Sequence, residues 1–135
     1  MYMRNGIKLP FRVGVSPTLH IRGLIATQRI DKGTLIERCP AIAYKKNAEA
    51  DKTIFAKYVF DWDETHEALA LGYGSLYNHS EKRNVEVDFD LPKKEIVFTA
   101  LRDIDVGEEL LINYNDDSTD PVDPDYISFD KDLQN

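Results

Sequence analysis

The sequence has 135 residues, of which 42% are hydrophobic and 30% charged, and its net charge is −7. This length and composition predict one globular domain over residues 1–135 and exclude a disordered chain. The sequence has no apolar run long enough to cross a bilayer and no secretory signal at its start, and its single cysteine excludes an internal disulfide framework.

The excess of acidic residues narrows the class of partner. Direct nucleic-acid binding needs a basic surface that neutralises phosphates, so the charge disfavours it. An acidic surface instead suits a basic protein or peptide, although excess acid often only maintains solubility. We therefore expect a cytoplasmic or nuclear protein with no membrane partner.

The N-terminal half is expected to contain short strands at 24–30, 34–37 and 41–44, with a turn at 31–33 between the first two. One stretch, 51–62, has the spacing of a helix. Its apolar residues recur every three or four positions and would share one face: Ile54, Phe55, Tyr58, Val59 and Trp62. The fold class predicted from these segments is mostly β with a few short helices.

The C-terminal half continues with strand patterns. Val85, Val87, Phe89 and Leu91 alternate with polar residues, which is the spacing of a strand. A turn at 91–94 then leads into an apolar segment at 95–101, so a hairpin is expected. Another strand is expected at 108–114, and no repeat, linker or low-complexity segment is evident.

The triplet Asn78-His79-Ser80 is the first candidate for chemistry. A Ser-His hydrolase is disfavoured because neighbouring side chains on an extended segment point to opposite faces, and no Gly-x-Ser-x-Gly turn is present. The three histidines show no close ligand spacing, so no metal site is predicted. Taken alone, the triplet is more typical of a polar turn.

Three stretches in register change that interpretation. Arg22-Gly23-Leu24, "GYGSLYNHSEKRN" (72–84) and "GEELLINY" (107–114) together resemble the motifs of the SET-domain protein lysine methyltransferases. The resemblance runs from about His20 to Asn115 and is similar in particular to the minimal SET proteins of viruses and bacteria. It implies small β-sheets with a threaded C-terminal segment, a pseudoknot.

The resemblance also implies a function, namely transfer of methyl groups from S-adenosyl-L-methionine to the ε-amine of lysine in a protein, with a histone tail as a candidate substrate. Tyr114 would be the catalytic residue, orienting the amine at the mouth of a narrow channel. Tyr73, Val87 and Ile112 would line that channel. The residues expected to bind the cofactor are Arg22, Gly23, Leu24, Asn78, His79 and, in the tail, Phe129.

Residues 116–135 would form an acidic tail that replaces the cysteine-rich module of larger relatives and places Phe129 on the adenine, with Tyr126 as the second choice. Two alternative functions stay open at this point. The chain could be a catalytically silent SET-like module that grips a peptide, or an interaction domain whose acidic tail binds basic proteins. A homodimer is also open, and a viral or intracellular source would place the protein in a host nucleus or on chromatin.

Overall fold

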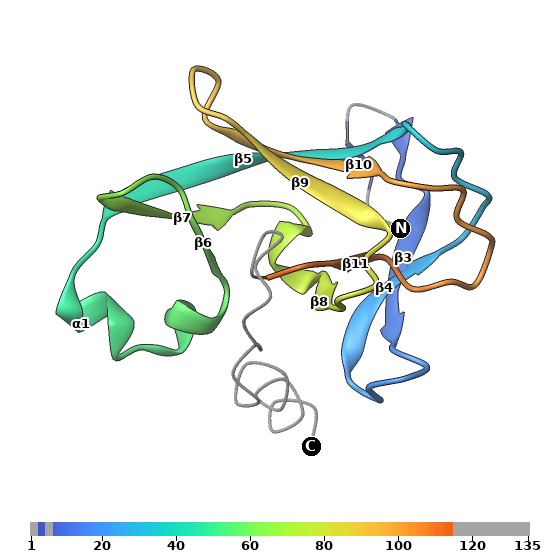
Figure 1. Cartoon of the computed structure of the whole chain (residues 1–135), viewed down its shortest axis with the longest axis horizontal. Helices are drawn as coiled ribbons and strands as arrows, with labels where there is room; N and C mark the ends of the chain where they lie inside the picture. The colour runs from blue at the N-terminus through green and yellow to red at the C-terminus, as the bar shows by residue number, and fades with distance from the viewer. Residues whose placement is uncertain (1–2, 5–6, 115–135) are drawn as a thin grey trace.

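The computed structural model describes residues 3–4 and 7–114 and consists mainly of short β-strands (Figure 1), so the mostly β fold with a few short helices is confirmed. The strands are β1 (Met3–Arg4), β2 (Ile7–Lys8), β3 (Phe11–Val15), β4 (Arg22–Ala26), β5 (Leu35–Lys45), β6 (Val59–Asp61), β7 (His66–Ala70), β8 (Asn78–His79), β9 (Val85–Asp90), β10 (Glu95–Ala100) and β11 (Leu111–Ile112). The helical turns are α1 (Ala48–Asp51), η1 (Ile54–Lys57) and η2 (Gly74–Leu76). No helix in this described part is long and apolar enough to span a membrane.

The largest sheet has five strands in the order β6-β7-β5-β10-β9, all antiparallel. The predicted strands 34–37 and 41–44 are one continuous strand, β5. Its first half, through Pro40, pairs with β10, and its second half, from Ala41 onward, pairs with β7. Proline has no N–H to donate to a ladder, and here it lies where the strand exchanges one neighbour for the other.

The predicted hairpin is confirmed as β9 and β10, which pair from Val85–Ala100 to Asp90–Glu95. β9 ends one residue before Leu91, which is half exposed in the turn. Ile96 and Phe98 on β10 are completely buried and carry the centre of the hydrophobic core.

The helix predicted over 51–62 is wrong. Asn47 caps the single turn of α1, η1 follows, and Val59–Asp61 joins the sheet against β7. Ile54 and Phe55 stay 44% and 59% exposed, so a helical face there would have no core to cover. β-Branched and aromatic residues favour strands, and Phe60 instead meets the Phe98 ring, with centroids 6.2 Å apart.

Two further strands are shorter than predicted, and six of the described strands were not predicted. The strand expected at 24–30 is β4, which ends at Ala26, and the one expected at 108–114 is regular only in β11. Ile30 and Ile104 form an isolated bridge instead of extending either strand. The longest unpredicted strands are β3, which pairs with β4, and β7, and each of them mixes polar residues into its pattern. The others are the short strands β1, β2, β6 and β8.

The two C-terminal motifs meet in a parallel strand pair, β8 with β11, which lies between the five-stranded sheet and the β3–β4 pair (Figure 1). The Asn84 side chain hydrogen-bonds to the segment 109–112 on the side opposite β8. Its Nδ2 donates to the carbonyl of Glu109 and its Oδ1 accepts from the N–H of Leu111, both at 2.8 Å. The segment 109–112 is thus held between β8 and Asn84, as a threaded C-terminal segment requires.

Asn84 is 1% exposed, so its two hydrogen bonds have no water to replace them. Asn84→Ala would leave a buried carbonyl and a partly buried N–H unpaired, and we expect the free energy of unfolding to fall by about 2 to 4 kcal/mol. Urea denaturation monitored by circular dichroism measures this change. Asn47→Ala, which removes an exposed cap from α1, is the control and should cost about 1 kcal/mol or less. Equal losses in the two variants would contradict the holding role of Asn84.

Candidate active site

The β8–β11 pair brings the Asn78-His79 motif beside the end of the last strand. Leu111 pairs with Asn78 and Ile112 with His79, and the N–H of Ser80 donates to the carbonyl of Ile112. The next residues continue this contact, since the backbone N–H of Tyr114 donates to Nδ1 of His79 at 3.1 Å. The two rings lie 5.2 Å apart between centroids. Motifs separated by more than 30 positions therefore form one cluster.

The hydroxyl of Tyr114 is aimed at the main chain. It donates to the carbonyl oxygen of Tyr77 at 2.9 Å, while the side chain remains 39% exposed. Tyr114 is thus fixed at both ends, because its backbone N–H donates to His79 and its hydroxyl donates to the Tyr77 carbonyl. A hydroxyl fixed on a carbonyl at a partly exposed residue can orient a small polar group.

His79 is neutral in this arrangement. Burial lowers the pKa of its imidazole, and the nearby Glu81 offsets the effect only partly. Because Nδ1 accepts a hydrogen bond from Tyr114, the ring proton belongs on Nε2. The backbone of Tyr114 thus depends on an unprotonated histidine.

A buried carboxylate, Glu109, joins the first motif to the second. One oxygen accepts from the Asn78 amide at 2.7 Å, and the other accepts from the hydroxyl of Ser16. Gly23 lies against this pair, because a Cβ there would come within 2.4 Å of the Glu109 carboxylate and 2.7 Å of the Asn78 amide nitrogen. The glycine of the first motif is therefore required by packing inside the protein.

Arg22 and Leu24, on either side of Gly23, hold the neighbouring segments through hydrogen bonds to their backbone carbonyls. The carbonyl of Arg22 accepts a second hydrogen bond from the Asn78 amide, at 2.8 Å. Leu24 is completely buried, and its carbonyl accepts from the N–H of Leu110. The side chain of Leu24 belongs to the core, so only main-chain atoms at this position could contact a cofactor.

The three residues predicted to line a lysine channel lie on different elements. Ile112 is buried in β11, next to His79 in the strand pair. Tyr73 precedes η2 and packs edge-on against Phe11, with centroids 5.4 Å apart. Val87 is half buried on β9, opposite Phe98. Only Ile112 is brought directly into the motif cluster by strand pairing.

Sequence reasoning assigned no role to Tyr77 or Glu37. Tyr77 supplies the carbonyl that holds the Tyr114 hydroxyl, and Glu37 accepts from the N–H of Tyr73 at 3.1 Å. The position of Tyr77 directly before the Asn-His motif could have indicated its role. Nothing in the sequence indicates a role for Glu37, a single carboxylate in an apolar strand. Phe129 and Tyr126, the predicted adenine contacts, lie outside the described residues.

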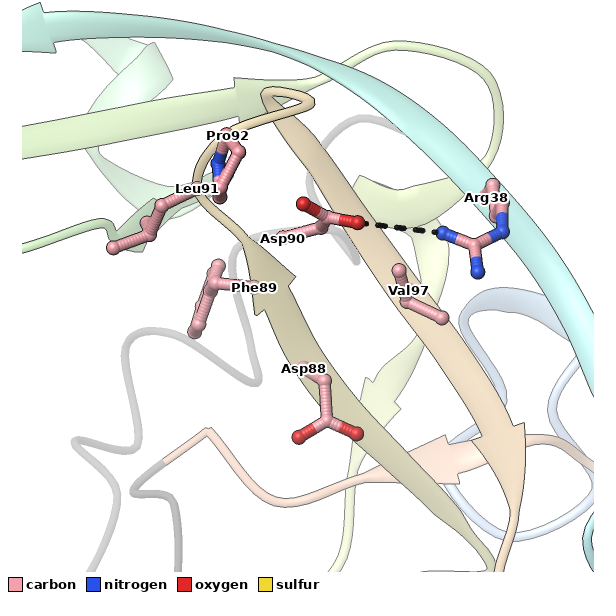
Figure 2. Close-up of a pocket in the computed structure, with 7 residues that line it drawn as sticks. All are labelled: Arg38, Asp88, Phe89, Asp90, Leu91, Pro92 and Val97. Carbon is pink, nitrogen blue, oxygen red and sulfur yellow. Dashed lines mark ion pairs between the residues drawn. The ribbon is translucent and has the colours of Figure 1, made fainter.

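A surface pocket of about 510 Å³ lies away from this cluster, at the outer end of the β9–β10 hairpin. Figure 2 shows Arg38 reaching across β10 toward Asp90, with 3.8 Å between the charged atoms. The pocket is lined by Arg38, Asp88, Phe89, Asp90, Leu91, Pro92 and Val97. None of these is a predicted site residue, so the pocket does not mark the active site.

Comparison with known proteins identifies the fold and the motifs together. A family model described as the SET domain matches residues 21–115. A relative from Schizosaccharomyces pombe, named as a histone-lysine N-methyltransferase specific for lysine 37 of histone H3, is 35% identical over 98 residues, which are 70% of this chain and 67% of the relative.

Two solved structures share the architecture. A Plasmodium falciparum protein named as a candidate histone methyltransferase superposes with a TM-score of 0.63 at 27% identity, covering 80% of this chain and 95% of that one. CpSET8 from Cryptosporidium also gives a TM-score of 0.63, at 23% identity, over 87% of this chain and 62% of its own, and supports the fold alone. These relatives are eukaryotic, so the similarity to minimal viral and bacterial proteins stays a prediction. The chain belongs to the SET-domain family and is a homologue of histone-lysine methyltransferases.

Proposed function

We propose that this chain transfers methyl groups from S-adenosylmethionine to the ε-amine of a lysine in a basic protein, with Tyr114 at the reacting centre. The observation that carries the proposal is the 2.9 Å hydrogen bond from the Tyr114 hydroxyl to the Tyr77 carbonyl, at a partly exposed position beside the Asn78-His79 motif. Methyl transfer is an in-line displacement, so holding the amine in line supplies much of the acceleration. A hydroxyl and a carbonyl fixed side by side suit that task.

The residues of the first two motifs fit the cofactor in their chemistry. Bound S-adenosylmethionine would supply an electrophilic methyl group on its sulfonium. Arg22 is a half-buried cation beside the motif cluster and suits the methionine carboxylate. Both amide hydrogens of Asn78 are committed to Arg22 and Glu109, which leaves its Oδ1 to accept from a cofactor amine or hydroxyl.

The remaining cofactor contacts are proposed at the main chain of Gly23, Leu24 and His79, with Phe129 of the tail on the adenine. Backbone donors and acceptors can read the edge of a purine, and an aromatic ring can cover its face. The protein's own groups then have three tasks, which are to bind the cofactor, orient the amine and exclude water. No proton transfer by Tyr114 is required, since the lysine attacks as the neutral amine.

The proposed substrate is a histone or another basic protein. The relative from fission yeast is named for lysine 37 of histone H3, and the net charge of −7 favours a cationic partner. A nuclear location follows from such a substrate. The runner-up function, a silent module that grips a peptide, keeps the fold but needs no fixed Tyr114 hydroxyl. Labelled S-adenosylmethionine with purified histones distinguishes the two.

The first prediction concerns Tyr114. Tyr114→Phe deletes the hydroxyl but keeps the ring on His79, so we expect turnover to fall about 100-fold or more. Cofactor affinity should change by less than about threefold, because the hydroxyl acts on the amine and the methyl group. Turnover by mass spectrometry and affinity by calorimetry separate the two effects. Tyr44→Phe, which removes a hydroxyl at the far end of β5, is the control, and an active Tyr114→Phe enzyme would refute the assignment.

The second prediction concerns Asn78. Asn78→Ala should weaken S-adenosylmethionine binding by roughly 1 to 3 kcal/mol, because a buried polar contact is lost. It also deprives Glu109 of a donor, so affinity must be measured on protein shown to be folded. Asn47→Ala removes an exposed amide that caps α1 and makes no proposed cofactor contact, so it should bind within about threefold of the parent. Unchanged affinity in folded Asn78→Ala would count against the cofactor site.

The third prediction concerns pH. Because burial lowers the pKa of His79, its neutral form stabilises the fold fully above the ordinary histidine value of about 6.5. That contribution is lost as the pH falls through the lowered pKa, when a proton on Nδ1 would face the Tyr114 N–H. Turnover should therefore fall on the acid side together with the His79 titration followed by NMR. A His79 midpoint at or above 6.5 would contradict this.

A further inference from the structure

A carboxylate is buried beneath the segment that carries the reacting centre. Glu37 lies on β5, between two core residues of the same strand, and is only 4% exposed. Its neighbour Arg38 points to the other face of the sheet, toward Asp90 (Figure 2). Glu95 also lies within 3.6 Å of the Arg38 guanidinium. A carboxylate costs free energy to bury unless polar groups face it, so the groups around Glu37 are informative.

Two of those groups belong to the stretch just before the Asn-His motif. The N–H of Tyr73 donates to Glu37 at 3.1 Å. The phenol of Tyr77 is 1% exposed and lies beside the same side chain, and burial together with the Glu37 charge raises the pKa of Tyr77 well above its ordinary value. Tyr77 therefore keeps its proton, and its buried hydroxyl, which makes no hydrogen bond of ordinary geometry, lies in the field of the Glu37 carboxylate. Glu37 thus acts on residues at both ends of η2, through a hydrogen bond from the Tyr73 N–H and through its charge near Tyr77.

The residues between Glu37 and the proposed reacting centre are closely packed. The ring of Tyr77 stacks on Phe98 with centroids 4.2 Å apart and planes 1° from parallel. Gly74, inside η2, is packed so closely that a Cβ would come within 2.6 Å of Ala70. The carbonyl of the same Tyr77 accepts the Tyr114 hydroxyl. A shift of η2 would therefore move the carbonyl that fixes the hydroxyl.

We propose that Glu37 is a positioning residue for methyl transfer, which holds Tyr73 and Tyr77 so that the Tyr77 carbonyl stays in register with the Tyr114 hydroxyl. This inference rests on the proposed function. Glu37 acts through the main chain of Tyr77 and does not touch the substrate. It sets the geometry of the transition state more than the affinity for either substrate.

The test is Glu37→Gln, which keeps the shape and an acceptor for the Tyr73 N–H but removes the charge. We expect kcat to fall about tenfold or more, because small displacements at a reacting centre are costly. The Kd of S-adenosylmethionine and the KM of the protein substrate should stay within about threefold. Glu95→Gln, which removes a carboxylate from the opposite face of the same sheet, is the matched control and should leave kcat unchanged.

A second variant makes the result decisive even where Glu37→Gln folds poorly. Tyr77→Phe keeps the stack on Phe98 and removes only the phenol hydroxyl, so it should also lower kcat. The double variant should lose no more than the stronger single one, since both changes remove the same interaction between the Glu37 charge and the Tyr77 hydroxyl. A lowered melting temperature with unchanged kcat, or additive losses, overturns the positioning role while the enzyme stays active. A parent chain with no methyl transfer refutes the proposed function itself.

Discussion

The buried carboxylate of Glu109 fixes the relative positions of three chain segments. Only 5% of the residue is exposed, and a charge at that depth persists only where donors surround it. Ser16 comes from the loop before β4, and Asn78 comes from β8. The packing that puts both donors against one carboxylate leaves no room for a side chain at residue 23. The amide of Asn78 also reaches the carbonyl of Arg22, so β4, β8 and the segment before β11 converge on one cluster.

These contacts to Glu109 explain how strands of only two residues can hold the candidate active site in place. β8 and β11 are each two residues long, and isolated pairing of that length is marginal in water. Asn84 adds a second set of hydrogen bonds on the far side of the incoming segment, and the Tyr77–Phe98 stack fixes the residue before β8 to the main sheet. The site is therefore rigid because separate polar and aromatic contacts support it from the sheet, the loop and the β3–β4 pair.

Patterns in the sequence predicted those parts of the fold that depend on interactions between residues close together in the chain. The hairpin of β9 and β10 follows from alternation and a turn, and both were present in the sequence. The helix expected at 51–62 failed because Val59 and Phe60 pair with β7 while Ile54 and Phe55 stay exposed in η1, and β7 was hidden by its polar residues. The three motifs predicted the family and the residues around Asn78 and Tyr114. They could not predict Glu37 or the Tyr77 carbonyl, because a buried carboxylate and a main-chain atom acquire their roles only from distant segments.

The contact between the Tyr114 hydroxyl and Tyr77 has a consequence for how this enzyme can vary. The acceptor is a main-chain oxygen, and every amino acid supplies one, so a substitution at residue 77 can shift it but never delete it. A natural substitution or an alanine scan at residue 77 changes the ring that stacks on Phe98. Either change leaves the carbonyl oxygen of residue 77 in place. Semisynthesis that replaces the Tyr77 carbonyl by a thiocarbonyl would change the acceptor itself while preserving every side chain. In the proposed reacting centre, the acceptor of the Tyr114 hydroxyl therefore belongs to the backbone, which no side-chain substitution removes.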